Sequence, residues 1–591
     1  MYGEVEVQND ETAVDTERQA YASDAVVDTA GVVNGSPGQI VCRVQLLRAQ
    51  NVALIEDQVR GGDLRANAIG QAAINECRPL NLFGKGNQSP EALAYITAQV
   101  DANQRNEQEQ AVASLSGELW DFWGAGRIGA AVGVEYRREG TEGVGRDDEG
   151  VDRLLFLNEG GDQPYVEYES QEAFAELAIP LFRDSWLGEY AELSGSYRYF
   201  DYTSVGHGDV YGVNLVYRPI ADIAFKSSFN TSLRAPSLGE NFAPLSQTFA
   251  NFALDDPCRT VNINAPNNAE FRANRIANCT ALAAQQGITY DFAGATNTTA
   301  DDFDPSVLGT GGTAGVAGGN PFLTPEESES FTFSTVIQPR MFPDLNIVLD
   351  YFEIEITNVI AAVGPNIVAA NCVNGPTLNQ AACATIFRNN PALPFAIGAP
   401  AGDPIGGFIQ GSINYAKRTT RGMDFTARYR LDLEEAFGRN WGRLDYRVGG
   451  TWLIEQKQFN NAENLNDYTG LDSTITYPRV RLTSSLTYTP NDVWSLNWTM
   501  DWQTAQDNAS KIREYATTGN PDARIPLDID TGDFARHDFT VRINVNDQLT
   551  LRTGVVNAFD AEQPRYLGTA LTDNLDPWGT RFFIGLNYRP F

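Results

Sequence analysis

Two alternating segments on either side of a tight turn place the strongest constraint on this chain. Every second residue in each segment is apolar or aromatic, apart from Ser227 and Thr231 in the second, and most of the residues between are polar or small. The alternating positions are Tyr211, Val213, Leu215, Tyr217, then Ile223, Phe225, Phe229 and Leu233. Successive side chains of a strand point to opposite faces, so a period of two gives one apolar and one polar face. Only residues 219–222 separate the segments, which predicts a β-hairpin.

The two ends of this hairpin are very different. One end is the tight turn, whereas beyond Pro236 no strong strand pattern returns until about residue 330. Short turns at one end and long loops at the other are typical of a transmembrane β-barrel of the outer-membrane type. A soluble β-sandwich also alternates, so the hairpin alone does not separate the two architectures.

The same strand pattern recurs through most of the chain. We predict further strands at 113–123, 127–139, 171–181, 188–202, 330–339, 345–356, 414–433, 441–453, 479–490, 493–502, 537–545, 548–556 and 579–591. The apolar face switches between Tyr351 and Phe352, which predicts a β-bulge. Ser89 and Pro90 have the residue types that begin a helix, so 89–100 is predicted to be helical.

These segments predict an all-β fold, a transmembrane antiparallel barrel with about 15–16 strands present, long outer loops and short periplasmic turns. Aromatic residues near the strand ends, which suit the two membrane interfaces, favour the barrel. We divide the chain into 1–110, a partial strand with a long extracellular loop region, and 111–591, the barrel. The predicted long loops are 140–165, 235–327, 357–408, 455–477 and 503–534.

Composition excludes two other classes. No run of 18 apolar residues occurs, so a membrane-spanning helix is not expected. The formal net charge is −33, and nucleic-acid binding requires a basic face, so no nucleic-acid partner is expected.

The six cysteines fall in three sequential couples, each inside a predicted loop. They are Cys42 with Cys77, Cys258 with Cys279, and Cys372 with Cys383. Six cysteines allow 15 pairings, of which pairing between neighbours is the simplest. Six free thiols are the alternative. Loop disulfides indicate an oxidising compartment such as the periplasm or the cell surface.

The first residues, MYGEVEVQND, contain neither a basic stretch nor an apolar stretch. A signal peptide requires both. We therefore expect the chain to be a processed or truncated piece of a longer one.

No catalytic, cofactor or metal motif is recognised. The two histidines, His207 and His537, lie outside any HExxH or GxSxG motif. Residues 309–314, GTGGTA, imitate a dinucleotide-binding loop but do not follow a strand pattern, so we interpret them as a flexible loop. We expect no enzyme, no cofactor and no bound metal.

Basic residues recur on the polar face of the predicted strands, next to carboxylates such as Glu135. We predict that the lumen is lined by Arg137, Arg198, Lys226, Arg234, Arg428, Arg430, Arg447, Arg542, Arg552 and Arg581. One interpretation is an electropositive wall that holds a plug or guides an anionic ligand. The other is a set of charges neutralised by neighbouring Asp and Glu in a wet lumen.

Several segments, in this order and spacing, resemble the TonB-dependent outer-membrane receptors. They are SLRAPSLGENFAP (232–244), NPFLTPEESESFTFS (320–334), LDYFEIEITNVI (349–360), RGMDFTARY (421–429), VVNAFDAEQP (555–564), the final strand and CRPLNLFGKGNQSPEALAYI (77–96). The resemblance extends from about residue 40 to the end. It implies a barrel of 22 strands in the outer membrane of a Gram-negative bacterium.

The resemblance also implies active uptake of a scarce nutrient such as a siderophore, vitamin or oligosaccharide. The implied partners are outer-membrane lipid, the barrel-assembly machinery and a TonB-type energy-coupling protein, which engages through an N-terminal TonB box and plug. Neither of these is visible here, so we expect a plugless C-terminal portion that does not perform coupled transport alone. Phe591 is the expected C-terminal assembly signal, although Pro590 puts it out of phase with Phe582, Ile584, Leu586 and Tyr588. A passive porin-like channel and a surface-binding barrel that does not transport remain as alternatives.

Overall fold

The computed structural model describes residues 1–52, 68–145, 160–294, 301–309, 312–400, 403, 405–414, 417–459, 468–474, 476–506, 531–563, 565–566, 569–570 and 578–589. The expected signal Phe591 and most of the predicted loop 503–534 lie outside these residues, as do 146–159 and 460–467 in two other predicted loops.

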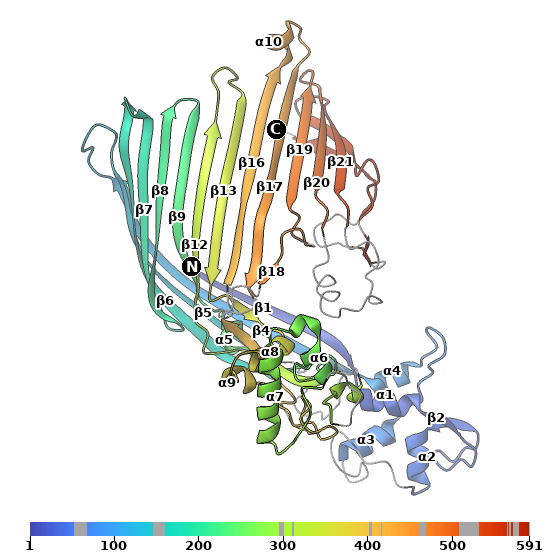
Figure 1. The fold of residues 1–591 in the computed structure, drawn as a ribbon. Coiled ribbons are helices and arrows are strands. Elements are labelled where there is room, and N and C mark those ends of the chain that lie inside the picture. The colour runs from blue at the N-terminus through green and yellow to red at the C-terminus, as the bar shows by residue number, and fades with distance from the viewer. Residues whose placement is uncertain are drawn as a thin grey trace.

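One antiparallel sheet of 17 strands dominates the fold (Figure 1). Its strands are β1 (Tyr2–Val14), β4 (Thr97–Glu118), β5 (Gly129–Val144), β6 (Gln163–Ser185), β7 (Gly188–Tyr202), β8 (Gly206–Ile220), β9 (Ile223–Arg234), β12 (Glu326–Ile337), β13 (Leu345–Thr357), β16 (Lys417–Asp432), β17 (Arg443–Phe459), β18 (Tyr468–Gly470), β19 (Val480–Thr489), β20 (Trp494–Gln503), β21 (Phe534–Asn544), β22 (Leu549–Val556) and β25 (Arg581–Tyr588). Each strand pairs with the next in this order, except that β18 and β19 both pair with β17.

The registers confirm the alternation predicted from the sequence. Residues directly opposite each other in neighbouring strands lie on the same face, so Val213 shares a face with Phe229, and Phe229 with Phe331. This outer face exposes apolar side chains from β5 to β25. It includes Val132, Val134, Leu193, Val213, Leu215, Phe333, Leu349, Trp452, Leu496 and Ile584. A wide apolar outer surface is what a lipid bilayer requires of a barrel.

The two ends of the sheet differ as expected. Short connections and helix α10 (Leu433–Phe437) lie at one end, and the helical loops gather at the other (Figure 1). Exposed aromatic residues follow the short-turn end, namely Trp120, Phe122, Trp123, Trp186, Phe342, Phe437, Trp441 and Trp494. Such aromatic residues form a belt where a barrel meets the membrane surface.

The loops after β9 and after β13 fold together, and we call residues 235–325 and 358–414 the cap. The cap contains α5 (Leu238–Phe242), β10 (Ser246–Ala250), α6 (Thr260–Asn264), η1 (Pro266–Asn268), α7 (Arg272–Gln285), η2 (Pro305–Leu308), β11 (Thr313–Gly318), β14 (Ile360–Ala362), α8 (Pro365–Asn374), α9 (Gln380–Cys383) and β15 (Ile409–Asn414). A four-stranded sheet, β10-β11-β15-β14, joins the two loops. Thr313 and Ala314, the last residues of the predicted flexible loop 309–314, belong to β11, so the loop interpretation is wrong for these two residues.

A second lobe lies between β1 and β4. It contains α1 (Thr16–Ser23), β2 (Ala25–Asp28), β3 (Gln39–Cys42), α2 (Arg43–Ala49), α3 (Ala68–Glu76) and α4 (Pro90–Ile96). Elsewhere in the chain, a short strand pair, β23 (Arg565–Tyr566) with β24 (Thr569–Ala570), lies between β22 and β25. The helix predicted at 89–100 is confirmed over Pro90–Ile96, and at its start the Ser89 hydroxyl accepts from the Ala92 amide at 3.1 Å. The prediction is wrong for 97–100, which begin β4. None of the described helices is long and apolar enough to cross a membrane.

The division at residue 110 is wrong as a strand boundary. β4 begins at Thr97, and β1 pairs with it along all 13 of its own residues. On one face of this paired segment Gln8 lies opposite Asn103 and Asp10 opposite Asp101, and on the other face Val5 and Val7 lie opposite Asn106 and Gln104, so neither face is continuously apolar. Because no face is continuously apolar, the alternation is weak here and the sequence indicated only a partial strand.

The β-bulge predicted between Tyr351 and Phe352 is also wrong. β13 pairs without a register shift to both β12 and β16. The outward positions change from Leu349 and Tyr351 to Glu353 and Glu355 because the strand passes from apolar to aqueous surroundings. The shift in register occurs one strand further on, at Arg421/Gly422 in the β16–β17 pair.

Candidate functional site

On the inner face of β5, β6 and β7, basic side chains are neutralised by glutamates. Arg198 bonds Glu135 at 2.6 Å and also pairs with Glu172. Arg137 pairs with Glu139, whose other oxygen accepts from the Tyr168 hydroxyl at 2.7 Å. Here the second interpretation of the predicted lumen residues fits, namely charges balanced by their neighbours.

Arg234 lies where β9 ends and the cap begins. Its guanidinium bonds Glu326 at 2.8 Å and Glu240 at 2.9 Å. Burial raises the pKa of Glu240, but hydrogen bonds from Arg234 and from the Ser237 amide outweigh burial and lower it overall. Arg234 is therefore a structural link at the base of the cap. Lys226 lies on the inner face of β9, opposite Ser334.

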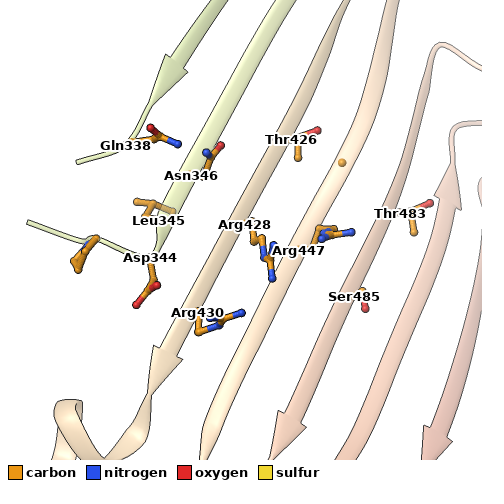
Figure 2. A pocket seen from close by; sticks show the side chains of 12 residues that line it. Gln338, Asp344, Leu345, Asn346, Thr426, Arg428, Arg430, Arg447, Thr483 and Ser485 are labelled. Carbon is orange, nitrogen blue, oxygen red and sulfur yellow. The ribbon is translucent and has the colours of Figure 1, made fainter. Parts of the chain in front are cut away.

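The inner face of β16 and β17 is different. Arg428 lies directly opposite Arg447, and neither guanidinium is within ion-pairing distance of a described carboxylate. Arg430, one step along the face, bonds Asp445 at 2.9 Å. All three arginines line one cavity of about 670 Å³, together with Gln338, Asn346, Thr426, Thr483 and Ser485 (Figure 2).

A second pair of arginines continues this inner wall. Arg542 of β21 lies opposite Arg552 of β22, and Arg552 lies over the ring of Phe583 at 5.4 Å. Arg581 of β25 lies on the same face, since it is opposite Val556 and two residues from Phe583. Two like charges directly opposite each other in a sheet repel, so both pairs require a compensating partner.

The predicted lumen residues thus form two groups. The group on β5–β9 is neutralised, apart from Lys226. In the group on β16–β25, Arg430 bonds Asp445, whereas Arg428, Arg447, Arg542 and Arg552 have no ion pair with a described carboxylate. The alternation in the sequence predicted the lumen arginines, but the sequence analysis did not identify the polar residues that surround them. Thr426, Thr483 and Ser485 lie at the same parity as Arg428 and Arg447, and that parity was the signal available in the sequence.

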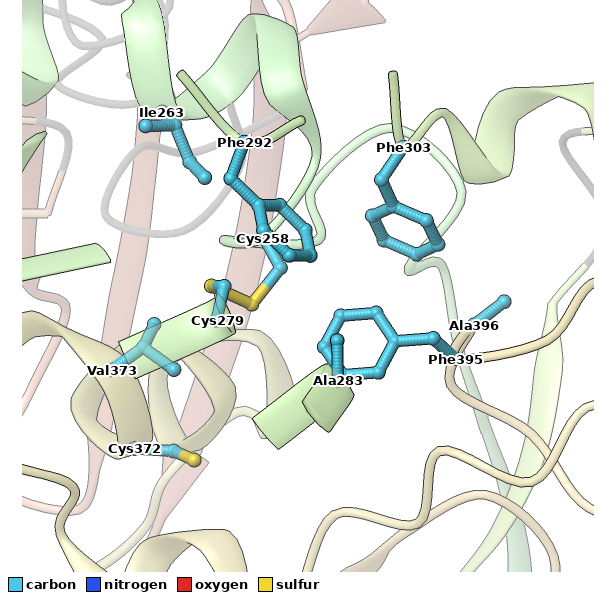
Figure 3. Close-up of a cluster of buried hydrophobic side chains, with 10 residues drawn as sticks. All are labelled: Cys258, Ile263, Cys279, Ala283, Phe292, Phe303, Cys372, Val373, Phe395 and Ala396. Atoms are coloured by element: carbon cyan, nitrogen blue, oxygen red, sulfur yellow. A yellow bond between two sulfur atoms is a disulfide. The ribbon is translucent and has the colours of Figure 1, made fainter. Parts of the chain in front are cut away.

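The cap holds the main compact apolar core of the described chain. The core is formed by Cys258, Ile263, Cys279, Ala283, Phe292, Phe303, Cys372, Val373, Phe395 and Ala396 (Figure 3). The rings of Phe303 and Phe395 pack edge to face at 5.2 Å, a favourable geometry for aromatic pairs. Because these residues come from both loops, the loops bury one shared core.

The three predicted disulfides are confirmed. Cys258–Cys279 and Cys372–Cys383 cross-link the cap, and Cys42–Cys77 cross-links the lobe between β1 and β4. Asp256 and Arg388, one from each loop, form a two-armed ion pair at 2.8 and 2.9 Å. The side chain of Asp256 is 0% exposed and that of Arg388 7%, so this pair ties the two loops inside the cap.

The pKa values of several titrating groups in the cap are shifted by their surroundings. Burial raises the pKa of Asp255. Burial acts in the same direction on Asp304, but hydrogen bonds from Ser306 and Arg259 outweigh it and lower the pKa of Asp304 overall. Burial lowers the pKa of Arg275 to about 10.

The histidines do not form a catalytic arrangement. His537 lies on the outer face, where its Nδ1 accepts from the Trp498 indole at 3.1 Å, and His207 stacks on Tyr199. Within the described ranges, no group of three His, Cys, Asp or Glu side chains is placed to hold a metal ion.

An apolar outer face, a polar inner face and large loops at one end define an outer-membrane β-barrel of the receptor class. The model of the family described as "TonB dependent receptor-like, beta-barrel" matches residues 79–558. The chain therefore belongs to the TonB-dependent receptor family. Members of this family are transporters and not enzymes, which confirms the expectation of a non-enzymatic protein.

Solved structures of two receptors are similar to this fold. The siderophore receptor PirA from Acinetobacter baumannii is 15% identical with a TM-score of 0.50, the alignment covering 83% of this chain and 55% of the receptor. A ferric enterobactin receptor mutant (PfeA) from Pseudomonas aeruginosa is 16% identical with a TM-score of 0.50, covering 85% of this chain and 56% of the receptor. The chain thus spans about half the length of these receptors. No curated protein matches the sequence.

Proposed function

We propose that this chain forms the barrel wall of a TonB-dependent transporter that takes up a scarce nutrient across the outer membrane of a Gram-negative bacterium. Family membership over residues 79–558 is the observation that carries the proposal. In this proposal the cap and the other long loops face the exterior and capture the nutrient, and the short turns face the periplasm.

The positive charge of the inner wall favours an anionic nutrient as the substrate. Arg428, Arg447 and Arg542 lie on it without a described carboxylate partner. A positively charged wall in a confined space raises the local concentration of anions. Of the classes considered, siderophores, vitamins and oligosaccharides, an anionic ferric siderophore suits this wall best, and similar structures include a ferric enterobactin receptor.

Uptake measured in cells tests the proposal. Radiolabelled ferric enterobactin, cyanocobalamin and maltohexaose are supplied to Gram-negative cells that express the gene encoding this chain, with TonB present or deleted. We expect accumulation of one probe, ferric enterobactin first, that is lost without TonB. Uptake that persists without TonB and without a proton-motive force would favour a passive channel. Surface binding without uptake would favour a non-transporting receptor.

A further inference from the structure

Arg428 and Arg447 stand out among the charges of the inner wall. They are directly opposite each other in the β16–β17 pair, and both side chains are exposed to the lumen. Like charges at directly opposite positions of a sheet are destabilising. Nearby arginines on the same face are compensated, since Arg430 and Arg443 share Asp445, and Arg536 bonds Asp501 at 2.7 Å. The Arg428–Arg447 pair therefore carries positive charge that the described chain does not balance.

The surroundings of the pair are those of a binding site. The cavity of about 670 Å³ places amide and hydroxyl groups around the two guanidiniums, with Gln338 and Asn346 on one side and Thr483 and Ser485 on the other (Figure 2). One carboxylate, Asp344, lines the turn-side edge of the cavity, where its carbonyl accepts from the Arg430 amide at 3.3 Å. Asp344 thus lies next to Arg430, one step along from Asn346, which is opposite Arg428, and it forms no described ion pair with Arg428 or Arg447.

The geometry points to an oxyanion as the occupant. A guanidinium presents a planar fork of donors that matches the two oxygens of a carboxylate or phosphate, and two such forks bind a doubly charged group well. We propose that Arg428 and Arg447, with Thr426, Thr483 and Ser485, form a lumen subsite for a phosphate or carboxylate group.

The location of the subsite gives it a role. Gln338, Pro343 and Asp344 belong to the β12–β13 turn, so the cavity lies toward the short-turn end and away from the cap. The second like-charged pair, Arg542 with Arg552, lies three to four residues from the β21–β22 turn, in the same half of the wall. The subsite therefore holds an anionic group after it has passed the cap, on the exit side. This role rests on the proposed function, whereas anion binding itself does not.

Calorimetry on the purified full chain in detergent tests the subsite. The probes are inorganic phosphate and citrate at low ionic strength, which separate a phosphate-selective site from a polycarboxylate site. We expect binding of at least one probe that weakens as salt is added. Arg428→Gln with Arg447→Gln should raise the dissociation constant about tenfold or more, because charge-assisted hydrogen bonds are lost. Arg447→Lys should keep part of the affinity, since the charge remains without the fork.

The matched control is Arg137→Gln. It removes one positive charge from the same inner face, but at a residue already paired with Glu139. Binding should be unchanged in this variant, and circular dichroism checks that each variant is folded. Equal affinity in the double variant and the unaltered chain would overturn the subsite, even if stability changed, and would favour an acidic polypeptide segment as the partner of the pair. If Arg137→Gln weakened anion binding as much as the double variant does, the binding would depend on the overall positive field of the lumen and not on a specific site. This outcome would also overturn the subsite.

The subsite and the proposed function can fail separately. Anion binding by the purified chain with no TonB-dependent uptake in cells would keep the subsite and reject the transporter. TonB-dependent uptake with unaltered kinetics in the double variant, and no anion binding, would keep the transporter and reject the subsite.

Discussion

The guanidinium of Arg234 lies 2.8 Å from the carboxylate of Glu326, although the two residues are 92 positions apart in sequence. Arg234 ends β9 and Glu326 begins β12, so the ion pair joins the two points where the first loop of the cap leaves and rejoins the sheet. The second oxygen of Glu326 accepts from the Ile360 amide at 2.7 Å. One carboxylate thus joins the outgoing strand, the returning strand and the second loop of the cap.

Glu326→Gln should loosen the cap without unfolding the barrel. The change removes the charge that Arg234 and the Ile360 amide share, and the Glu326 side chain is only 14% exposed. We expect the free energy of cap opening to fall by about 1–2 kcal/mol. Hydrogen exchange of cap amides measures this change, while the amides of β5–β8 should keep their protection.

Asp222→Asn provides the control for this prediction. Asp222 pairs with Arg340 at 2.7 Å at the opposite, short-turn end, where the arginine is 73% exposed. Exposed pairs contribute little, about 0–1 kcal/mol. Equal loss of cap protection in both variants would contradict a specific role for Glu326.

The stability of the cap should depend on pH through Asp304. Hydrogen bonds from Ser306 and Arg259 hold the pKa of Asp304 below its usual range, against the effect of burial. A carboxyl whose pKa is lower in the folded state stabilises the fold above its unfolded pKa, about 4, and loses that contribution as the pH falls through the folded value. Asp304→Asn should therefore destabilise the cap at pH 7, and its effect should shrink progressively as the pH falls below about 4.

Asp255→Asn should act in the opposite direction. Burial raises the pKa of Asp255, so its ionised form opposes folding, and this cost is present once the pH has risen above the folded pKa. At pH 7 the substitution should leave the cap equally or more stable. The same hydrogen-exchange measurement tests this, and a loss of cap stability at pH 7 as large as that of Asp304→Asn would refute the raised pKa of Asp255.

Removing one partner of the Asp256–Arg388 pair should destabilise the cap strongly. Both side chains are buried, and Arg388 also lies over the ring of Phe395 at 4.5 Å. Breaking a buried pair leaves an uncompensated charge and costs about 3–5 kcal/mol. Arg388→Met should therefore cost more than the double change of Arg388→Met with Asp256→Leu. Thermal unfolding of the cap, followed by proteolysis, tests this order, and additive effects would contradict it.

The disulfides of the cap should contribute by restricting its unfolded state. Cys258–Cys279 closes 21 residues and Cys372–Cys383 closes 11. The chain-entropy relation gives about 3 kcal/mol for each. Replacing either couple by serines should therefore lower cap stability by a similar amount, and proteolysis should cut within 235–325 or 358–408 first. Cys42→Ser with Cys77→Ser is the control, because it should affect only the lobe between β1 and β4.

Alternation predicted most of the sheet because a one-residue slip would place every apolar side chain on the wrong face. The same rule failed where the membrane ends. At Glu353 the outer face turns polar without any change in register, which the sequence alone cannot distinguish from a bulge. In β1 and the first part of β4 neither face is continuously apolar, since Val5 and Val7 lie opposite Asn106 and Gln104, so periodicity identifies these strands only weakly.

The candidate site was predictable only in part. Arg137 and Arg428 look alike in the sequence, since each lies on the polar face of a strand. Whether such a residue is neutralised depends on neighbouring strands and side-chain reach, which place Glu139 beside Arg137 but Arg447 opposite Arg428. The neighbour pairing of the cysteines was easier to predict because each couple lies within one loop.

Two adjacent residues of β8 test which face of the sheet meets lipid. Val213 lies on the outer face opposite Phe229, and Asn214 lies on the inner face opposite Ser228. An arginine near the middle of a lipid-facing surface costs about 2–4 kcal/mol, whereas lumen positions tolerate charge. Val213→Arg should therefore reduce the amount of barrel that assembles in phospholipid vesicles and lower its resistance to urea, while Asn214→Arg should leave both nearly unchanged. If Asn214→Arg reduced assembly and urea resistance more than Val213→Arg, the apolar face would be the inner face. The assignment of Arg428 and Arg447 to a wet lumen would then also be wrong.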